Sequence, residues 1–265
     1  MIVPGHPEES MFNIALSLLL PHLEPYLIRS MNAAKPHVTD PGLKEDLLAF
    51  NAQEGQHYRA HRAFNDAVNA KGFPMVARHE ERLAADYHRF STTKSLAFNL
   101  AYAEGFEAMT MALARVSFEL RHFDRMHRDA RDLFAWHLVE ELEHRTVTYD
   151  VYKHVVGATF GSYLFRLIIG TFAQLHMFSW IAGLAFEMWQ SLDASVHARH
   201  GGLLGTLRRL VVDGVRIGVR FWPKLWWTFT PWYSPHRVRV PDTKKLLAEF
   251  ASAAIPLDVS EDATT

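Results

Sequence analysis

The spacing of apolar residues predicts a chain built from long helices. The first apolar run passes through Pro21 and Pro25. Each proline lacks the N–H that a helix interior needs, at a cost of roughly 3 kcal/mol, so we expect a kink, or a helix that starts again near Pro21. Asp40 and Pro41 form a good N-cap and first-turn pair for a second helix, which ends near Ala70.

Two more long helices follow a polar stretch. Residues 75–90 are polar and charged, which indicates a crossover with a short surface helix. A third long helix starts near Ser91, and Glu104 and Glu107 interrupt its apolar and small-residue face. A fourth runs over about 124–156. This pattern predicts an all-α fold.

The last third of the chain is more apolar. Residues 167–186 lack Asp, Glu, Lys and Arg and are long enough for a membrane helix. Gln174 and His176 interrupt the span, so a buried fifth helix, or one packed in a homodimer interface, is the favoured interpretation. Residues 203–233 mix arginines with a Trp-rich run and either lie at a membrane interface or cap the bundle. Contact of residues 163–233 with a membrane surface therefore stays open.

The length of the chain suits one domain over residues 1–265. About half of the residues are apolar, which is enough for a sizeable core. Within this domain we expect a metal-binding four-helix core over 10–156 and a helical extension over 162–233. The last residues, 254–265, read as a flexible tail.

Composition and charge exclude several classes of function. The chain has 28 basic and 29 acidic residues and a formal charge of −1, so we expect no nucleic-acid partner. It has no cysteine, so any metal must bind to oxygen and imidazole. The N-terminus does not read as a secretory signal, which makes the cytoplasm the default location. Membrane association through 163–233 is the alternative.

Two stretches carry a candidate metal site. In the segment from Trp136 to Tyr152, His137, Glu141 and His144 fall on one helical stripe, with Glu140 at its edge. An earlier segment, FNAQEGQHYRAH, repeats the Glu-x-x-His pair with one more histidine a turn away. Its three candidate ligands share one helical face and are Glu54, His57 and His61.

The order of these residues along the chain points to two metals. Four helices deliver Glu, Glu-x-x-His, Glu, Glu-x-x-His, which is the ligand order of ferritin-like di-iron and di-manganese bundles. Burying so many acids without cations would be costly. Glu104 is preferred to Glu107 as the third-helix ligand, and Glu140 either competes with Glu141 or orients an imidazole. His61 and His137 are ligands, second-sphere groups or packed histidines. The predicted ligand set is Glu24, Glu54, His57, His61, Glu104, His137, Glu141 and His144.

The same residues resemble a known family, the predicted metal-dependent hydrolases of the ferritin-like superfamily. FNAQEGQHYRAH is similar to its motif Phe-x-x-Gln-Glu-x-x-His-x-x-x-His, and WHLVEELEHRTVTYDVY to its Trp-His-x-x-Glu-Glu-x-Glu-His followed by Asp-Val-Tyr. Weaker agreement at PHLE, AEGFEA and PWYSPH extends the likeness over about 10–240. Leu23, Gly105 and Glu107 depart from the family pattern. The resemblance implies the same eight ligands, and the histidine-rich site is also similar to that of di-iron arylamine N-oxygenases.

A non-haem di-iron oxidase or oxygenase is the leading hypothesis for function. It would use O2 and an electron donor on a small apolar or aromatic substrate. The alternative is a metal-dependent hydrolase that uses a metal-activated water and tolerates Mn or Zn. Iron storage and a membrane-surface protein with a vestigial site are weaker alternatives. The expected cofactor is two metal ions, with Fe preferred and Mn or Zn as alternatives.

Overall fold

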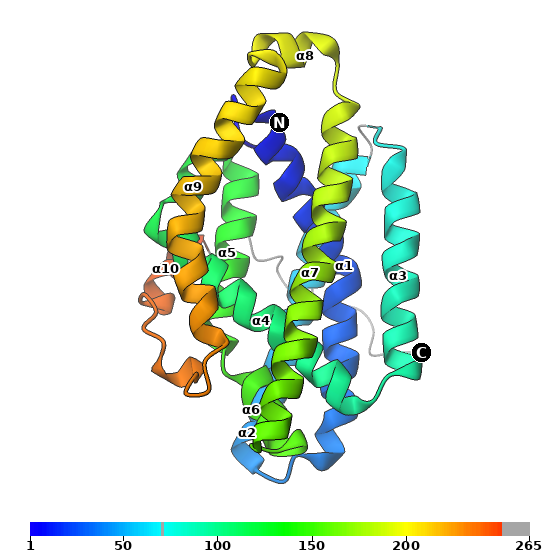
Figure 1. Cartoon of the computed structure of the whole chain (residues 1–265), viewed down its shortest axis with the longest axis vertical. Coiled ribbons are helices and arrows are strands. Elements are labelled where there is room, and N and C mark those ends of the chain that lie inside the picture. The colour runs from blue at the N-terminus through cyan, green and yellow to red at the C-terminus, as the bar shows by residue number, and fades with distance from the viewer. Residues whose placement is uncertain (70–71, 251–265) are drawn as a thin grey trace, which may run out of the picture.

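The computed structural model describes residues 1–69 and 72–250 (Figure 1). These residues form helices and no strand, so the all-α prediction is confirmed for them. The expected tail at 254–265 lies outside the described residues. The elements in order are α1 Pro7–Ala34, η1 Lys35–His37, α2 Pro41–Asn69, α3 Met75–Thr93, α4 Leu96–Glu119, η2 His122–Arg125, α5 Arg128–His144, α6 Val147–Val156, α7 Phe160–Gln190, α8 Ala194–Arg199, α9 Gly202–Thr228, η3 Pro235–Arg237 and α10 Thr243–Phe250.

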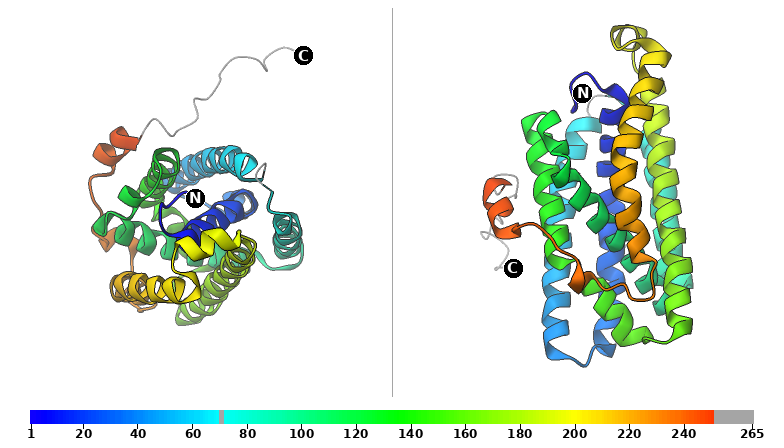
Figure 2. Two further views of the ribbon diagram at one scale, coloured as in Figure 1. Left: turned by 90° about the horizontal axis from the view of Figure 1, so that it is seen from above. Right: turned by 60° about the vertical axis from the view of Figure 1, so that its left-hand side comes forward.

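Helix α1 lies in the middle of the molecule. It packs against α2, α3, α4 and α7, and the view from above shows these helices arranged around it (Figure 2). Its side chains at Leu18, Leu19, Leu23, Leu27 and Met31 are fully buried. Apolar side chains lie on several sides of α1, so neighbouring helices can pack against each of these sides. This arrangement explains why so apolar a helix is buried in the core.

The prolines do not break α1, contrary to the sequence expectation. The helix is continuous from Pro7 to Ala34 through both Pro21 and Pro25. Pro21 cannot donate to the carbonyl of Ser17, but the side-chain amide of Asn65 on α2 donates to that oxygen at 2.9 Å. The lost backbone bond is replaced by one from a neighbouring helix, which removes a main reason for a break.

Two other helix boundaries differ from the sequence analysis. Residues 75–90, expected to hold only a short surface helix, lie in the 19-residue helix α3, which packs on α1 and α7 through Leu83, Tyr87 and Phe90. The expected single helix over about 124–156 is divided into α5 and α6. At the division, the Arg145 side chain donates to the Leu142 carbonyl and so satisfies an acceptor at the end of α5.

Helix α7 is long and only partly covered. It packs on α4, α1 and α3, whereas its outer side carries exposed apolar residues. By length and hydropathy two helices could cross a membrane, Pro7–His37 and Phe160–Gln190; 72% of the first apolar window is buried but only 28% of the second. The expectation of a buried fifth helix is therefore met on one side of α7 only.

Helices α4 and α7 approach closely at two glycines. A Cβ on Gly105 would overlap the backbone of Gly170, and a Cβ on Gly170 would lie 3.3 Å from the Cα of Gly105. Gln174 also donates to the Gly105 carbonyl at 3.1 Å. Gly105, which departs from the family pattern, is thus required by the packing of α7 in this chain.

We predict that Gly105→Ala lowers the free energy of unfolding by about 1–3 kcal/mol, because the added methyl group forces α4 and α7 apart. The control is Gly183→Ala on α7, where a Cβ meets nothing within 4 Å. That change should stabilise the protein by about 0.5–1 kcal/mol through helix propensity. Thermal and urea unfolding measure both. Equal effects of the two substitutions would contradict the close approach.

Candidate metal centre

Four helices bring seven potential ligands together in two groups. The first group holds Glu24 of α1, His57 of α2 and His137 of α5. In each group, one donor atom per residue lies within 4.8 Å of all the others. The rings of His57 and His137 stack with centroids 4.0 Å apart, and Glu24 Oε1 lies 4.0 Å from His137 Nδ1.

The second group centres on His144 at the end of α5. Its Nε2 lies 3.3 Å from Glu54 Oε1, 3.4 Å from Glu107 Oε2 and 3.3 Å from Glu141 Oε2. These four side chains come from α2, α4 and α5. Three carboxylates and one imidazole around one point are a donor set for a hard or borderline cation.

Glu141 lies between the two groups. Its Oε1 is 2.9 Å from His137 Nε2 and 3.8 Å from His57 Nδ1, both in the first group. Its Oε2 is 3.3 Å from His144 Nε2 in the second group. One carboxylate thus faces each group with a different oxygen, as a ligand that bridges two cations would.

The candidate donors are buried and several lack partners. All seven side chains belong to residues at most 4% exposed. Both oxygens of Glu24, Glu54 and Glu107, and Nδ1 of His57, have no hydrogen-bond partner among the described residues. Orphaned buried carboxylates are costly, and cations would satisfy them. The donor set therefore fits metal ions.

The protonation of these groups reflects the crowding of carboxylates. Burial and the neighbouring Glu141 raise the pKa values of Glu24 and Glu54 well above the usual range of a carboxyl group. The same two causes raise the pKa of Glu107 to about 8. Burial would also raise the pKa of Glu141, but His144 and hydrogen bonds from His137 and His144 hold it well below its usual range. Without cations, Glu141 is the charged member and its neighbours hold protons.

In the structure, Glu107 rather than Glu104 lies in the cluster of potential ligands. Glu104, preferred in the sequence analysis, lies outside both groups and accepts a 2.8 Å hydrogen bond from the buried guanidinium of Arg166. Arg166 also donates to the Thr228 carbonyl at 2.8 Å. Glu107, one helical turn further along α4, contacts His144 instead. The partner of Glu104 lies 62 residues away, so helix spacing alone could not separate the two.

His61 lies beside the first group rather than in it. Its Nε2 is 2.9 Å from His137 Nδ1, and its Nδ1 is 2.8 Å from Ser17 Oγ. Ser17 Oγ donates to Asn65 Oδ1 at 2.7 Å, so it must accept from His61 Nδ1–H. His61 Nε2 is then an acceptor for His137 Nδ1–H. This series of hydrogen bonds leaves Nε2 of His137 facing Glu141. In the described structure His61 therefore orients His137 and is not itself part of the first group.

The other two histidines are oriented in the same way. His57 Nε2 lies 3.0 Å from Glu140 Oε2, while its Nδ1 faces Glu54 and Glu141. His144 Nδ1 lies 3.1 Å from Gln53 Oε1, while its Nε2 faces the carboxylates. Each imidazole has one nitrogen held outside the cluster and one inside, which is the usual arrangement of metal-binding histidines. Glu140 therefore orients His57 and does not replace Glu141.

The sequence analysis did not identify these supporting residues. Ser17, Gln53 and Asn65 are common polar residues whose partners lie on other helices. Arg166 lies in the C-terminal extension, far from the motifs in sequence. Only Gln53 could have been recognised as a supporting residue from the sequence, because it is the glutamine of the family motif.

Comparison with known proteins assigns the family. A family model described as "Predicted metal-dependent hydrolase" matches residues 1–238. The chain belongs to this family. The family's description agrees with a cluster of buried acids and histidines that fits metal. No curated protein and no solved structure matches the chain.

We predict that Glu107→Gln weakens metal binding by about tenfold or more, because it removes one of three anionic donors around His144. The matched variant Glu104→Gln should keep the metal content but lower the free energy of unfolding by about 3–5 kcal/mol, since it leaves Arg166 buried without its partner charge. Chelator competition and urea unfolding measure the two effects. Metal loss in Glu104→Gln but not in Glu107→Gln would contradict the assignment.

Proposed function

We propose that this family member is a dinuclear metal-dependent hydrolase acting on a small molecule. The position of Glu141 between two donor groups is the observation that supports two metals. The family's description supports hydrolysis over the oxidase reaction favoured in the sequence analysis. The ligand order along α1, α2, α4 and α5 is that of ferritin-like proteins. We therefore also propose that this protein is related to them.

The residues that would hold the metals follow from the two groups. Zinc or manganese ions bound there would supply Lewis acidity and acidify a ligated water. The protein contributes the anionic donors, the fixed orientation of each imidazole and the exclusion of bulk water from a site at most 4% exposed. The proposed ligands are Glu24, Glu54, His57, Glu107, His137, Glu141 and His144.

Glu140 is suited to move a proton at the edge of this site. Its side chain is 12% exposed, and its two oxygens face His57 Nε2 and Trp136 Nε1. Burial raises its pKa to about 7. A carboxyl group with a pKa near neutrality can accept and return a proton under the conditions in which the enzyme would work. Because Oε2 contacts the nitrogen of His57 that faces away from the donor groups, we propose that Glu140 exchanges a proton with His57 Nε2.

A second candidate function is a di-iron oxidase or oxygenase, which the near-complete burial of the donors favours. A site shielded by helices on every side admits a small gas more readily than a polar substrate, and apolar surroundings protect reactive species. This reaction requires iron, O2 and an electron donor. It shares the ligands proposed for hydrolysis but not the need for proton transfer by Glu140.

The experiment that separates them uses one protein loaded with different metals. Zinc- and manganese-loaded samples should hydrolyse members of a panel of small esters, amides and phosphate esters without O2. Activity should be lost in Glu141→Ala/His144→Ala, and Glu140→Gln should lower kcat by about 10²-fold or more with unchanged metal content. Hydrolytic inertness, with O2 consumption by the reduced iron form, would overturn this proposal in favour of the oxygenase.

A further inference from the structure

The exposed apolar side chains of the described residues gather on one face. All but Met1, Phe12 and Leu48 lie between Phe160 and Trp232. They belong mainly to α7 and α9, which both lie on the front of the molecule in Figure 1 and on the same lower side in the view from above in Figure 2. We call this surface the α7/α9 face.

On α7 the exposed stripe contains no charge. It passes along the outer side of the helix for about seven turns, and the opposite side packs on α4 and α1. Its exposed large apolar members are Phe160, Leu164, Ile168, Phe172, Leu175, Phe178 and Phe186.

On α9 the exposed stripe follows the helical period. Residues 204, 207, 211 and 215 are apolar, exposed and spaced by three or four positions. Toward its C-terminal end the stripe becomes aromatic, with Trp222, Trp226 and Trp227 exposed and Trp232 just beyond the helix. Tryptophan gathers where an apolar phase meets water.

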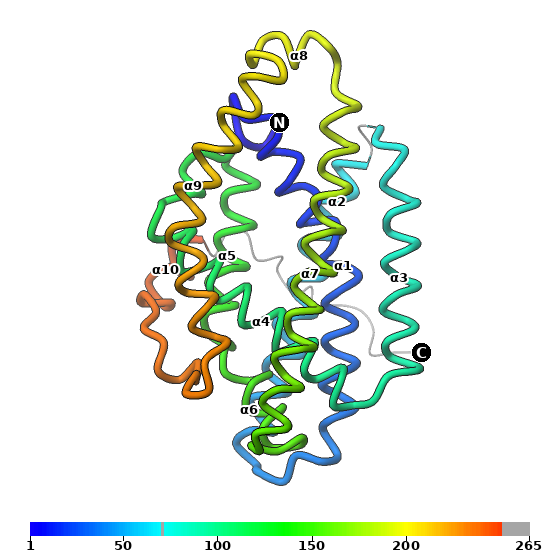
Figure 3. Tube along the Cα trace, in the orientation of Figure 1, coloured from blue at the N-terminus to red at the C-terminus, as the bar shows by residue number. Residues whose placement is uncertain are grey.

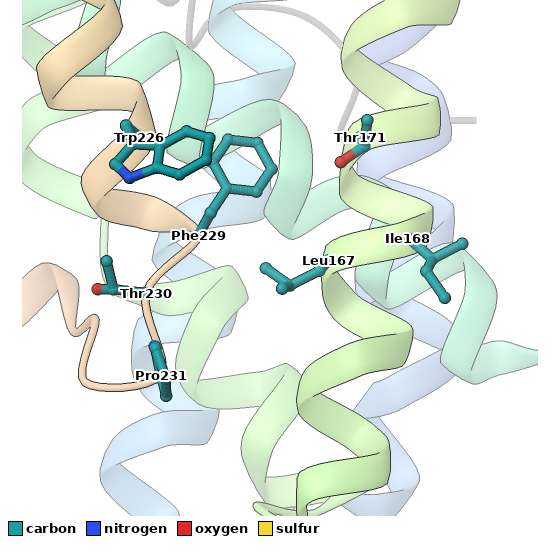
Figure 4. A pocket seen from close by; sticks show the side chains of 7 residues that line it. All are labelled: Leu167, Ile168, Thr171, Trp226, Phe229, Thr230 and Pro231. Atoms are coloured by element: carbon teal, nitrogen blue, oxygen red, sulfur yellow. The ribbon is translucent and has the colours of Figure 1, made fainter.

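A groove joins the two helices. It has a volume of about 690 Å³ and is lined by Leu167, Ile168 and Thr171 of α7 and by Trp226, Phe229, Thr230 and Pro231 at the end of α9. Figure 4 shows the side chains of Trp226 and Phe229 across from Leu167. Figure 3 shows α7 and α9 converging at the other end on α8. The α7/α9 face is therefore one surface rather than two separate stripes.

Basic residues border this face. Residues 160–232 contain seven basic and three acidic residues. Four of the basic residues pair with carboxylates elsewhere in the chain: Arg166 with Glu104, Arg209 with Glu8, and Arg220 and Lys224 with Glu119. Arg199 and Arg208 are exposed and form no ion pair among the described residues. Arg216, one helical turn after Val212, is also exposed, and its guanidinium donates to the Leu120 carbonyl at 3.4 Å. Long arginine side chains beside an apolar stripe can extend to lipid phosphates while the stripe enters the bilayer.

We propose that the α7/α9 face docks this protein on the surface of an anionic lipid bilayer. A contiguous apolar surface of this kind is rare on soluble monomers, where the largest patch is roughly 300–600 Å². The combination of an apolar stripe, tryptophans at one end and an arginine border is that of an interfacial helix. The protein lies on the bilayer and does not cross it, because the other side of α7 packs on α1, α3 and α4, and the same bundle exposes charged residues such as Arg62 and Asp66 on α2.

Charge favours the bilayer over a second copy of the chain. Two copies related by a two-fold axis would bring their arginine borders around one apolar interface, where like charges repel. An anionic lipid surface complements the same border. The proposal is independent of the reaction at the metal centre, because none of the proposed ligands lies on α7 or α9.

The test is binding of the full-length protein to vesicles. We expect co-sedimentation with phosphatidylglycerol-rich vesicles, weaker binding to pure phosphatidylcholine vesicles, and loss of binding at high salt. Val211→Glu/Val215→Glu should weaken binding by about tenfold or more, because both carboxylates would enter the contact. The control Leu48→Glu changes an exposed apolar residue on α2, outside the α7/α9 face, and should bind like the parent.

Two further readouts decide between a bilayer and a second copy. Brominated acyl chains should quench the fluorescence of the exposed tryptophans but not that of the buried Trp136, which is 2% exposed. Light scattering without vesicles should show a monomer for the parent and for both variants. A dimer that dissociates in Val211→Glu/Val215→Glu, or equal vesicle binding of that variant and the parent, would overturn the proposal.

Discussion

Several carboxylates are buried in the middle of the helical bundle. Glu24, Glu54, Glu107 and Glu141 come from four helices, and none of these residues is more than 2% exposed. Taking such groups out of water is costly unless cations or protons neutralise them. Burial raises the pKa of Glu24, Glu54 and Glu107, which favours their protonated forms when no cation is bound, and three histidines supply the nitrogen donors. Cations bound in the two donor groups would replace those protons and link the four helices.

The surrounding packing holds this cluster in place. The buried α1 carries Glu24 between two prolines, and Asn65 of α2 satisfies the carbonyl that Pro21 leaves free. Oδ1 of the same Asn65 accepts a hydrogen bond from Ser17, and Ser17 contacts His61, which in turn contacts His137. The residue that satisfies the α1 carbonyl therefore also helps to orient His61 and His137. Stability and site geometry thus share residues in this region. A change at Asn65 would affect both.

The predictable part of the site is the part that rests on local spacing. Glu54 and His57, and Glu141 and His144, are three residues apart, so an α-helix places each pair on one face whatever its neighbours do. Glu104 and Glu107 are also three apart, and the choice between them depends on the rotation of α4 and on Arg166, which is distant in the sequence. In the fold, the helical class followed from periodicity. The continuity of α1 and the packing of α3 did not, because both depend on contacts with other helices.

A metal count on the folded protein would show whether the cluster holds two ions. Native mass spectrometry of protein loaded with a divalent metal, with the excess removed, should show two ions per chain. Glu141→Ala should reduce the count to one or none while circular dichroism still shows a helical protein, because Glu141 faces both donor groups. A single ion in the parent protein, or two ions retained without Glu141, would contradict a dinuclear centre organised around this carboxylate.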